Sequence, residues 1–392
     1  MMNAEKTKTA LTANKIFVLL LLLIMLAGLA ATLFFPDDIN GYENRYAYKI
    51  APPTLSSVAD GSFQDGVENA LSDQVQFAAA AKKAYNFTVA VAAAPATMAL
   101  EDYFGADDYV YYNGSRFYNG KILFYTYSLA ERSAALDAKA ENINETAAKH
   151  PELEFFVYYI EKDTDIDMIS GVKPGLSDYF LPQINIPEEN KGCFRVDSFD
   201  VFDKYFYDTD HHWNYNGSYL GYTQVLSMIS GDEAIKPDGV YHSGQFFSGS
   251  KTFGMGNFFK DEMSIYRFDY PAMTITVNGV PAEDYGAQSR LIAGEIDIPT
   301  YGEVYGGDFG EIIFDTGKEG ENLLVIGESY DNAILKLLAS HFSKTYSVDL
   351  RYYAANMGED FDFDAYVAEH SIDKVLLIGN IDYFVMSEFS LR

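Results

Sequence analysis

The sequence predicts an α/β protein with a parallel sheet, and its C-terminal part carries the clearest evidence. Three short apolar runs, Asn322–Ile326, Thr345–Leu350 and Lys374–Ile378, have the length and composition of buried strands. The segments between them, 331–341 and 362–370, have helical character. A strand–helix–strand–helix–strand order implies parallel strands joined by right-handed crossovers.

The middle of the chain alternates strand and helix signals in the same way. Residues 129–149 are rich in Ala, Glu and Lys, which favours a helix. Residues 153–160, LEFFVYYI, are a strong candidate for a buried strand, and residues 214–229 again have helical character. Residues 239–320 are rich in Gly, Tyr and Phe with alternating pieces, so we expect a β-rich insertion there.

The N-terminus predicts a membrane anchor. Residues 16–35 form an uncharged apolar run, and a helix needs about 20 such residues to span a bilayer. Lysines precede this run and two aspartates follow it, so residues 1–15 are expected in the cytoplasm and the bulk of the chain outside. The competing interpretation is a cleaved signal peptide, whose apolar core is usually about 7–15 residues long. We therefore expect a connector at 36–75 and an exported domain at 76–392.

Composition excludes several classes of function. The 392 residues carry a net charge of −29, which repels the phosphates of nucleic acids. A single cysteine, Cys193, can form neither an internal disulfide nor a cysteine metal site. The sequence also carries no motif that requires a cofactor.

Ser329 is a candidate nucleophile because of its position. It follows the predicted strand at 322–326, and catalytic groups of open α/β sheets lie at the carboxyl ends of strands. Backbone N–H groups at the start of the next helix would point at it and could hold an oxyanion. The competing interpretation is an ordinary helix N-cap, a position that serine favours.

A nucleophilic serine needs a base, and the chain has only six histidines. Two are adjacent in the segment DTDHHW, residues 208–213, which also holds the single tryptophan, Trp213. In an extended segment alternate residues share a face, so Asp210 could orient His212. Two alternatives remain open: a metal site formed by the acids and histidines of this segment, and a solvated acidic loop with a structural tryptophan.

Asn380 follows the predicted strand at 374–378. Its side-chain amide would then lie at the same sheet edge as Ser329 and could donate a hydrogen bond to an oxyanion. An asparagine in a turn is the alternative.

The motif at 210–213, Asp-His-His-Trp, resembles the signature of the bacterial DHHW proteins. That family is similar to the SGNH-hydrolase-like proteins that O-acetylate alginate and other exopolysaccharides. The likeness extends to Glu43-Asn44-Arg45, Asp60-Gly61-Ser62-Phe63 and Asp73-Gln74, and to the stretch 323–353 with LLVIGESYDNAILKLLASHF and VDLRYY.

The resemblance implies roles for individual residues. Matching the His-Trp pair makes His212 the base, Asp210 the acid that orients it and Ser329 the nucleophile. The spacing Asp208-x-x-His211 is the runner-up, because SGNH hydrolases use Asp-x-x-His. Two further expectations concern the substrate: Tyr330 and His211 are expected beside it, and Trp213 either walls a sugar site or braces its loop.

The sequence departs from the family pattern at two positions. Glu328 stands before the serine where an aspartate is usual, and the block around Asn380 reads Gly-Asn-Ile-Asp rather than Gly-x-Asn-Asp. Both departures bear on how an oxyanion would be held.

The resemblance implies a three-layer, flavodoxin-like parallel sheet that is circularly permuted, since the Asp/His motif precedes the serine. It further implies an O-acetyltransferase or O-acetylesterase that acts on a cell-surface or secreted polysaccharide, without cofactor or metal. A membrane-embedded acyltransferase would be the partner that supplies the acyl group. The alternative is a non-catalytic glycan-binding or assembly protein of the same fold.

Overall fold

The structure is a computed structural model, and it describes part of the chain in detail. The chain divides into two compact units, Met1–Ala93 with Phe253–Phe258, and Ala94–Thr252 with Phe259–Arg392. The described residues are 15–28, 30, 38–40, 45–59, 61–75, 78, 80–85, 87–88, 110–112, 115–252, 259–386 and 391.

Within the described residues, the first unit contains helical segments at residues 15–28 and 80–85, two short strands and two further helices. Strands β1 and β2 pair antiparallel, and helices α2 and α3 follow them. Their bounds are Ile39–Asn40, Arg45–Tyr46, Leu55–Ala59 and Ser62–Gln74.

The anchor expected at 16–35 lies partly outside the described residues. Within the described residues, no helix combines the length and the apolar character needed to cross a membrane.

An eight-stranded mixed sheet forms the centre of the second unit, in the order β11-β10-β12-β14-β13-β15-β6-β7. Neighbouring strands from β14 to β7 are parallel, and those from β11 to β14 are antiparallel. The bounds are β6 Glu154–Ile160, β7 Lys191–Phe194, β10 Thr274–Val277, β11 Val280–Ala282, β12 Glu311–Asp315, β13 Asn322–Ile326, β14 Lys344–Val348 and β15 Lys374–Gly379.

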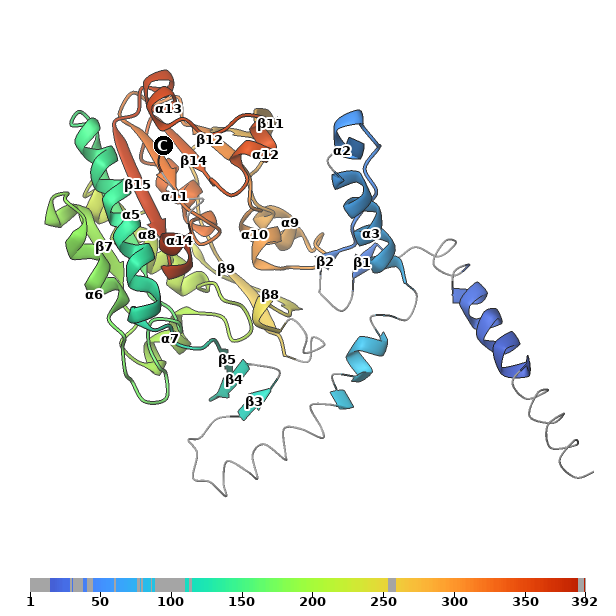
Figure 1. The fold of residues 1–392 in the computed structure, drawn as a ribbon. Helices are drawn as coiled ribbons and strands as arrows, with labels where there is room; N and C mark the ends of the chain where they lie inside the picture. Colours follow the sequence, from blue (N-terminus) through green and yellow to red (C-terminus); the bar gives the residue numbers. More distant parts are fainter. Residues whose placement is uncertain are drawn as a thin grey trace, which may run out of the picture. The chain divides into compact units, whose positions relative to one another are not determined.

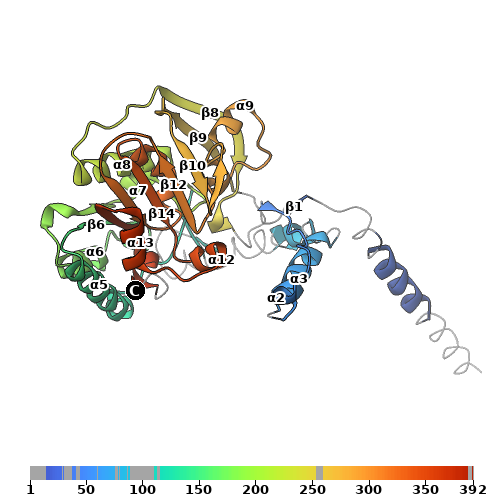
Figure 2. The same ribbon diagram turned by 90° about the horizontal axis from the view of Figure 1, so that it is seen from above.

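Helices cover both faces of this sheet (Figures 1 and 2). The sheet and helices α5, α6, α12, α13 and α14 form one hydrophobic core. The sheet and helices α7, α8, α9, α10 and α11 form the other. The bounds are α5 Leu129–Lys149, α6 Leu176–Phe180, α7 Phe199–Tyr205, α8 Tyr215–Ile229, α9 Gln288–Ala293, α10 Tyr301–Tyr305, α11 Leu335–Ala339, α12 Tyr353–Met357, α13 Phe363–His370 and α14 Ile381–Val385.

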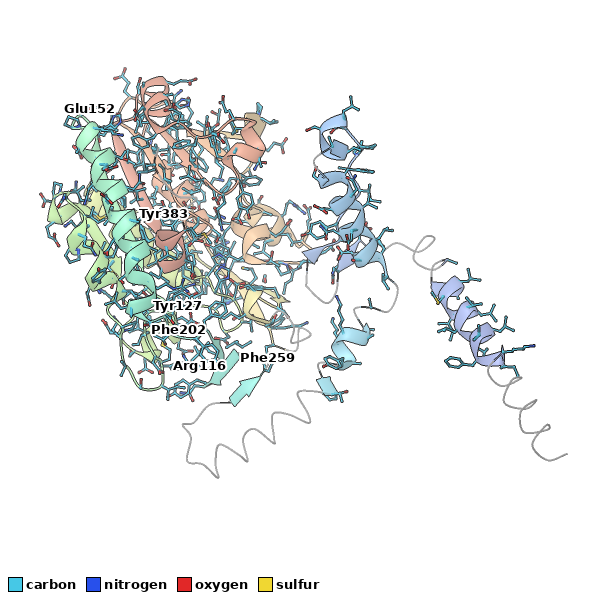
Figure 3. All side chains as sticks on the ribbon, viewed as in Figure 1. Arg116, Tyr127, Glu152, Phe202, Phe259 and Tyr383 are labelled. Atoms are coloured by element: carbon cyan, nitrogen blue, oxygen red, sulfur yellow. The ribbon has the colours of Figure 1, made fainter. Side chains whose placement is uncertain are left out.

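Strand β6 shows why both faces must be covered. Phe155 and Val157 belong to one core, whereas Phe156 and Tyr158 belong to the other. Successive strand side chains point to opposite faces, so an unbroken apolar run needs a helical layer on each side. Side chains fill the space between the layers (Figure 3), and this arrangement is compatible with the expected three-layer α/β fold.

Two smaller sheets complete the second unit. Strands β3, β4 and β5 form an antiparallel sheet, and β8 and β9 form a pair. The bounds are β3 Val110–Tyr112, β4 Ser115–Tyr118, β5 Lys121–Leu123, β8 Gly239–Phe247 and β9 Asp261–Arg267.

The predicted strands and helices lie close to the observed ones, with two differences. The helix expected at 331–341 is divided into a 3-10 turn, Asp331–Ala333, and α11. At this division the Asn332 side chain contacts other segments: its NH₂ group donates to the Gly306 carbonyl at 3.0 Å, and its oxygen accepts from the Tyr285 hydroxyl at 2.6 Å. The region 239–320 contains strands as expected, but β10, β11 and β12 extend the main sheet antiparallel.

Candidate active site

Ser329 lies at the carboxyl end of β13, the strand between β14 and β15 in the sheet. Its side chain is partly exposed, whereas Glu328 and Tyr330 on either side are buried. Among the described residues, no acceptor takes a hydrogen bond from the backbone N–H groups of Ser329 and Tyr330. Both donors lie in the turn that carries the serine.

Asp210 and His212 lie in the segment between α7 and α8. A short antiparallel bridge between Phe206 and Trp213 closes this segment into a loop. The amide of Asn214 donates to the Tyr205 carbonyl at 2.8 Å, and the Asn214 side chain caps the start of α8. The loop is thus held at both ends by backbone hydrogen bonds.

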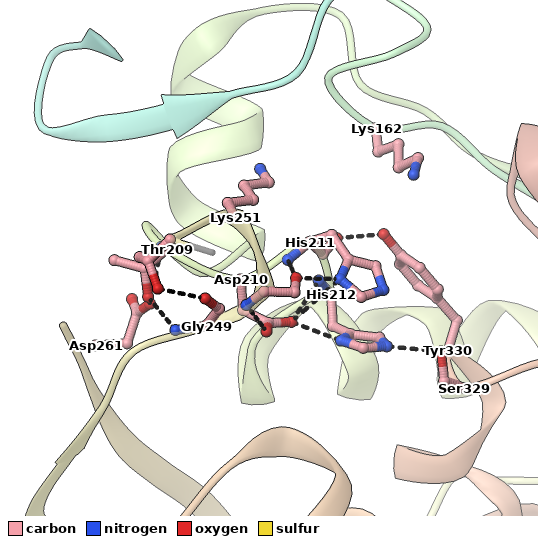
Figure 4. A network of polar contacts seen from close by, with 12 residues as sticks. Lys162, Thr209, Asp210, His211, His212, Gly249, Lys251, Asp261, Ser329 and Tyr330 are labelled. Carbon is pink, nitrogen blue, oxygen red and sulfur yellow. Dashed lines mark hydrogen bonds and ion pairs between the residues drawn. The ribbon is translucent and has the colours of Figure 1, made fainter. Parts of the chain in front are cut away.

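The structure brings Asp210, His212 and Ser329 together in one hydrogen-bonded line (Figure 4). His212 Nδ1 lies 2.6 Å from Asp210 Oδ1, and His212 Nε2 lies 2.7 Å from Ser329 Oγ. An ionised carboxylate can only accept, so the Nδ1 hydrogen donates to Asp210 and Nε2 accepts from the serine hydroxyl. This is the tautomer that a general base for Ser329 requires.

Asp210 is held ionised by its surroundings. The backbone N–H groups of His212 and Ser250 donate to its two oxygens at 3.0 and 2.9 Å. Burial alone would raise the pKa of Asp210, but the charge of His212 and these hydrogen bonds outweigh it and bring the pKa well below its usual value. Gly249 allows the close approach, since a Cβ there would lie 2.4 Å from the Asp210 Cβ.

His211 is placed beside the line rather than in it. Its Nδ1 lies 2.5 Å from Ser250 Oγ and 3.7 Å from Asp210 Oδ1, and its ring lies 3.8 Å from that of His212. Burial, followed by the positive charge that His212 can carry, holds the pKa of His211 well below its usual value, so this imidazole is neutral at neutral pH.

The runner-up pair is not brought together. Asp208 instead forms an ion pair with Lys121 at 2.5 Å, and its amide donates to Asp261 at 2.8 Å. The geometry therefore favours Asp210 and His212 over Asp208 and His211.

Trp213 and Tyr330 are fully buried. The indole ring packs on Gly221, where a Cβ would lie 2.5 Å from the ring, and its centroid is 5.7 Å from the Tyr330 ring. The Tyr330 hydroxyl donates to the His211 carbonyl. In this arrangement both rings pack inside the protein and brace the loop.

Asn380 lies at the expected sheet edge, but its side chain is already engaged. Its amide donates to Glu328 Oε1 at 2.5 Å, and its carbonyl accepts from the Asp382 amide at 2.7 Å. Glu328 also lies 3.4 Å from Ser329 Oγ through its other oxygen. Burial raises the pKa of Glu328. The two residues that depart from the family pattern thus contact each other directly.

Several contacts of the site have no counterpart in the motif analysis. Tyr301 stacks on the His212 ring, and Ser250 contacts Asp210 and His211. Lys251 forms a fully buried ion pair with Asp163 at 2.8 Å, and Figure 4 draws Lys251 with the residues of this network. The charged run EKDTD after the predicted strand at 153–160 could have pointed to Asp163, whereas no sequence signal marks Tyr301.

In the described part of the chain, one group of residues could hold a metal ion, because its potential ligand atoms lie within 4.8 Å of one another. The group consists of Asp210, His211 and His212. Two ligands of a tetrahedral Zn²⁺ at about 2.0–2.1 Å stand about 3.3 Å apart. The 2.6 Å between Asp210 Oδ1 and His212 Nδ1 instead matches a hydrogen bond. The geometry thus fits a proton between these two groups better than a metal ion.

Several solved structures resemble this one. PatB1 from Bacillus cereus is 18% identical and covers 73% of this chain and 100% of its own, with a TM-score of 0.54. PatB1 with a sulfonyl adduct gives a TM-score of 0.53 at 18% identity, covering 71% of this chain and 97% of its own. A DHHW family protein from Eubacterium siraeum is 17% identical and covers 71% of this chain and 95% of its own, with a TM-score of 0.54.

The chain therefore has a DHHW-like fold. The resemblance to DHHW proteins, which the motif at 210–213 indicated, is confirmed by the structural neighbours at the level of the fold. No protein-family model and no curated protein matches the sequence.

Proposed function

We propose that this protein is a serine acyl-transfer protein, an O-acetyltransferase or O-acetylesterase that acts on a cell-surface or secreted polysaccharide. The observation that carries the proposal is the continuous line from Asp210 through His212 to Ser329, with hydrogen bonds of 2.6 and 2.7 Å. An aligned acid, base and serine at the carboxyl end of a strand is the arrangement that activates a serine hydroxyl.

The residues can carry out acyl transfer in two steps. As Ser329 Oγ forms a bond to the acyl carbon, its proton moves to His212 Nε2, and that proton then goes to the departing alkoxide as the ester bond breaks. In the second step a sugar hydroxyl or water gives its proton to His212 and takes the acyl group, and Ser329 regains its proton. The N–H groups of Ser329 and Tyr330 would hold the oxyanion in both steps.

The fold and the motif together support the acyl chemistry. The chain shares its fold with PatB1, which has also been solved with a sulfonyl adduct. The Asp-His-His-Trp motif resembles that of proteins related to exopolysaccharide O-acetylation. Because Asp210 and His212 precede Ser329, we infer a circularly permuted SGNH-like arrangement.

We further propose that the domain works outside the cytoplasm. The apolar run at 16–35, preceded by lysines, supports a single-pass anchor with the bulk of the chain extracytoplasmic. A membrane-embedded acyltransferase would then be the partner that delivers the acyl group across the bilayer.

The proposal is tested with the full-length chain purified in detergent, an acetyl ester reporter and an arylsulfonyl fluoride. Ser329→Ala should lower kcat by at least about 10³-fold and abolish sulfonylation at this residue, because the reacting oxygen is lost. Ser340→Ala, whose buried hydroxyl only contacts the Lys336 carbonyl, should behave like the wild type. Equal turnover by wild type and Ser329→Ala would refute the proposal.

One observation favours a second candidate, a non-catalytic glycan-binding protein of the same fold. The Asn380 amide, expected at the oxyanion, is bound to Glu328 instead. Glycan binding that is unchanged in Ser329→Ala and His212→Ala, together with a wild type that has no esterase activity, would favour this candidate.

A further inference from the structure

The His212 imidazole is held between two other rings. On one side the Tyr301 ring is parallel to it, with an interplanar angle of 3° and a centroid distance of 3.8 Å. On the other side lies the His211 ring, also at 3.8 Å and tilted by 37°. A ring covered on both faces can turn about its side-chain bonds only by pushing a neighbour aside.

Tyr301 is itself firmly placed. It is the first residue of α10, and Thr300 caps that helix by accepting from the Glu303 amide at 3.3 Å. Its side chain is 2% exposed, and its hydroxyl donates to the carbonyl of Tyr330 at 3.3 Å. One side chain thus contacts both the imidazole and the residue after Ser329.

A second hydrogen bond connects Tyr330 with the segment that carries the base. The Tyr330 hydroxyl donates to the carbonyl of His211, the residue before His212. The segment with the nucleophile and the segment with the base are therefore joined by this hydrogen bond as well as by the contact between Ser329 and His212. Tyr301 completes this link from a third segment.

We propose that Tyr301 is a positioning residue of the acyl transfer, which holds the plane of His212 and stabilises the imidazolium. The inference rests on the function proposed above. When the Ser329 proton moves to His212 Nε2, the imidazole becomes a cation directly over the π face of Tyr301. A cation over an aromatic face is stabilised, and more so where water is excluded.

The other face of His212 does not oppose this charge. Burial keeps His211 neutral, so the imidazolium meets one neutral imidazole, the stacked Tyr301 ring and, at 4.9 Å, the tilted Tyr330 ring. Asp210 supplies the opposite charge in the plane of the ring through Nδ1. The hydrogen bonds fix the edge of the imidazole, and the stacked Tyr301 ring and the tilted His211 ring lie against its faces.

The test compares three variants of the full-length chain on the acetyl ester reporter. Tyr301→Leu removes the π face, and we expect kcat to fall by about 10-fold, with at most about 30-fold for a fully desolvated pair, while KM stays within about twofold. Tyr301→Phe keeps the ring and loses only the hydroxyl, so its kcat should stay within about threefold of the wild type.

Tyr346→Leu is the matched control. Tyr346 is also buried and lies 4.5 Å from a histidine ring, that of His370, away from Ser329. Both Leu variants remove a similar ring and should lower Tm similarly, but only Tyr301→Leu should lower kcat. The His212 Cε1 proton should also lose its upfield ring-current shift in Tyr301→Leu and keep it in Tyr301→Phe.

The outcomes separate the two proposals. Turnover by the wild type with an unchanged kcat in Tyr301→Leu would overturn the role of Tyr301 alone. A fall in kcat that is as large in Tyr301→Phe or in Tyr346→Leu would also overturn it, because the effect would then not follow the stacked ring. A wild type without turnover and without sulfonylation of Ser329 would overturn the acyl-transfer proposal itself.

Discussion

Asp210→Asn replaces one oxygen of a buried carboxylate by an NH₂ group of nearly the same size. In the wild type both oxygens accept: Oδ1 from the amide and Nδ1 of His212, and Oδ2 from the Ser250 amide at 2.9 Å. In the variant the NH₂ group must face one of these donors. If it faces Nδ1, His212 has to carry its proton on Nε2, where it points at Ser329 and blocks the base.

The expected loss is large. A wrong tautomer combined with the loss of the charge that stabilises the imidazolium typically lowers kcat by about 10³–10⁴-fold, which corresponds to about 4–5.5 kcal/mol. Stability should fall as well. The pKa of Asp210 in the folded chain is held below its unfolded value of about 3.9, so the ionised group stabilises the fold throughout the neutral range and loses this contribution only as pH falls through the folded pKa.

The assay is steady-state hydrolysis of an acetyl ester at pH 7 together with Tm by circular dichroism. Asp208→Asn is the control, because Asp208 lies in the same loop and is paired with Lys121 rather than with a histidine. A kcat for Asp210→Asn within about threefold of the wild type would refute the idea that Asp210 orients His212.

Two further predictions concern stability. Gly221→Ala should lower the free energy of unfolding by about 1–3 kcal/mol in urea titrations, because the new methyl group would lie 2.5 Å from the Trp213 ring. Gly66→Ala is the control, since a Cβ there meets no atom within 4 Å. An equal loss of stability in the two variants would contradict the packing argument. Asp165 is a buried carboxyl, and burial raises its pKa to about 7. The folded state therefore binds this proton more tightly than the unfolded state does. The free energy of unfolding should fall by up to about 4 kcal/mol as pH rises from about 4 to about 7. Asp165→Asn should flatten the pH dependence of the unfolding free energy in that window, and an unchanged slope would speak against the raised pKa.

Four of the five parallel strands, β6, β13, β14 and β15, could be predicted because they are buried on both faces, whereas β7, whose residues are mostly half-buried, was not predicted. An apolar run such as that of β6 or β13 is a strong signal whatever its partners are. The antiparallel addition of β10, β11 and β12 to the same sheet could not be predicted, since these strands are short and their pairing depends on contacts distant in sequence.

The candidate site was predictable as far as local spacing reaches. Alternation in an extended segment suggested that Asp210 and His212 face the same way, yet Asp208 and His211 also fit an accepted spacing. Contacts between residues far apart in the chain separate the two options: His212 contacts Ser329, whereas Asp208 forms an ion pair with Lys121. The engagement of Asn380 by Glu328 depends on side-chain reach across the sheet edge, which no spacing rule describes.

The hydrogen bond between Ser329 and His212 joins residues 117 positions apart. The loop that carries His212 precedes strands β10, β11 and β12, whereas Ser329 follows them and lies at the end of a strand flanked by two later ones. A chain that emerges residue by residue exposes the base before the serine, and a chain whose sheet is still incomplete has not yet brought the two together. Such a chain is inactive, and the turnover measured for this protein would come only from molecules that have finished folding.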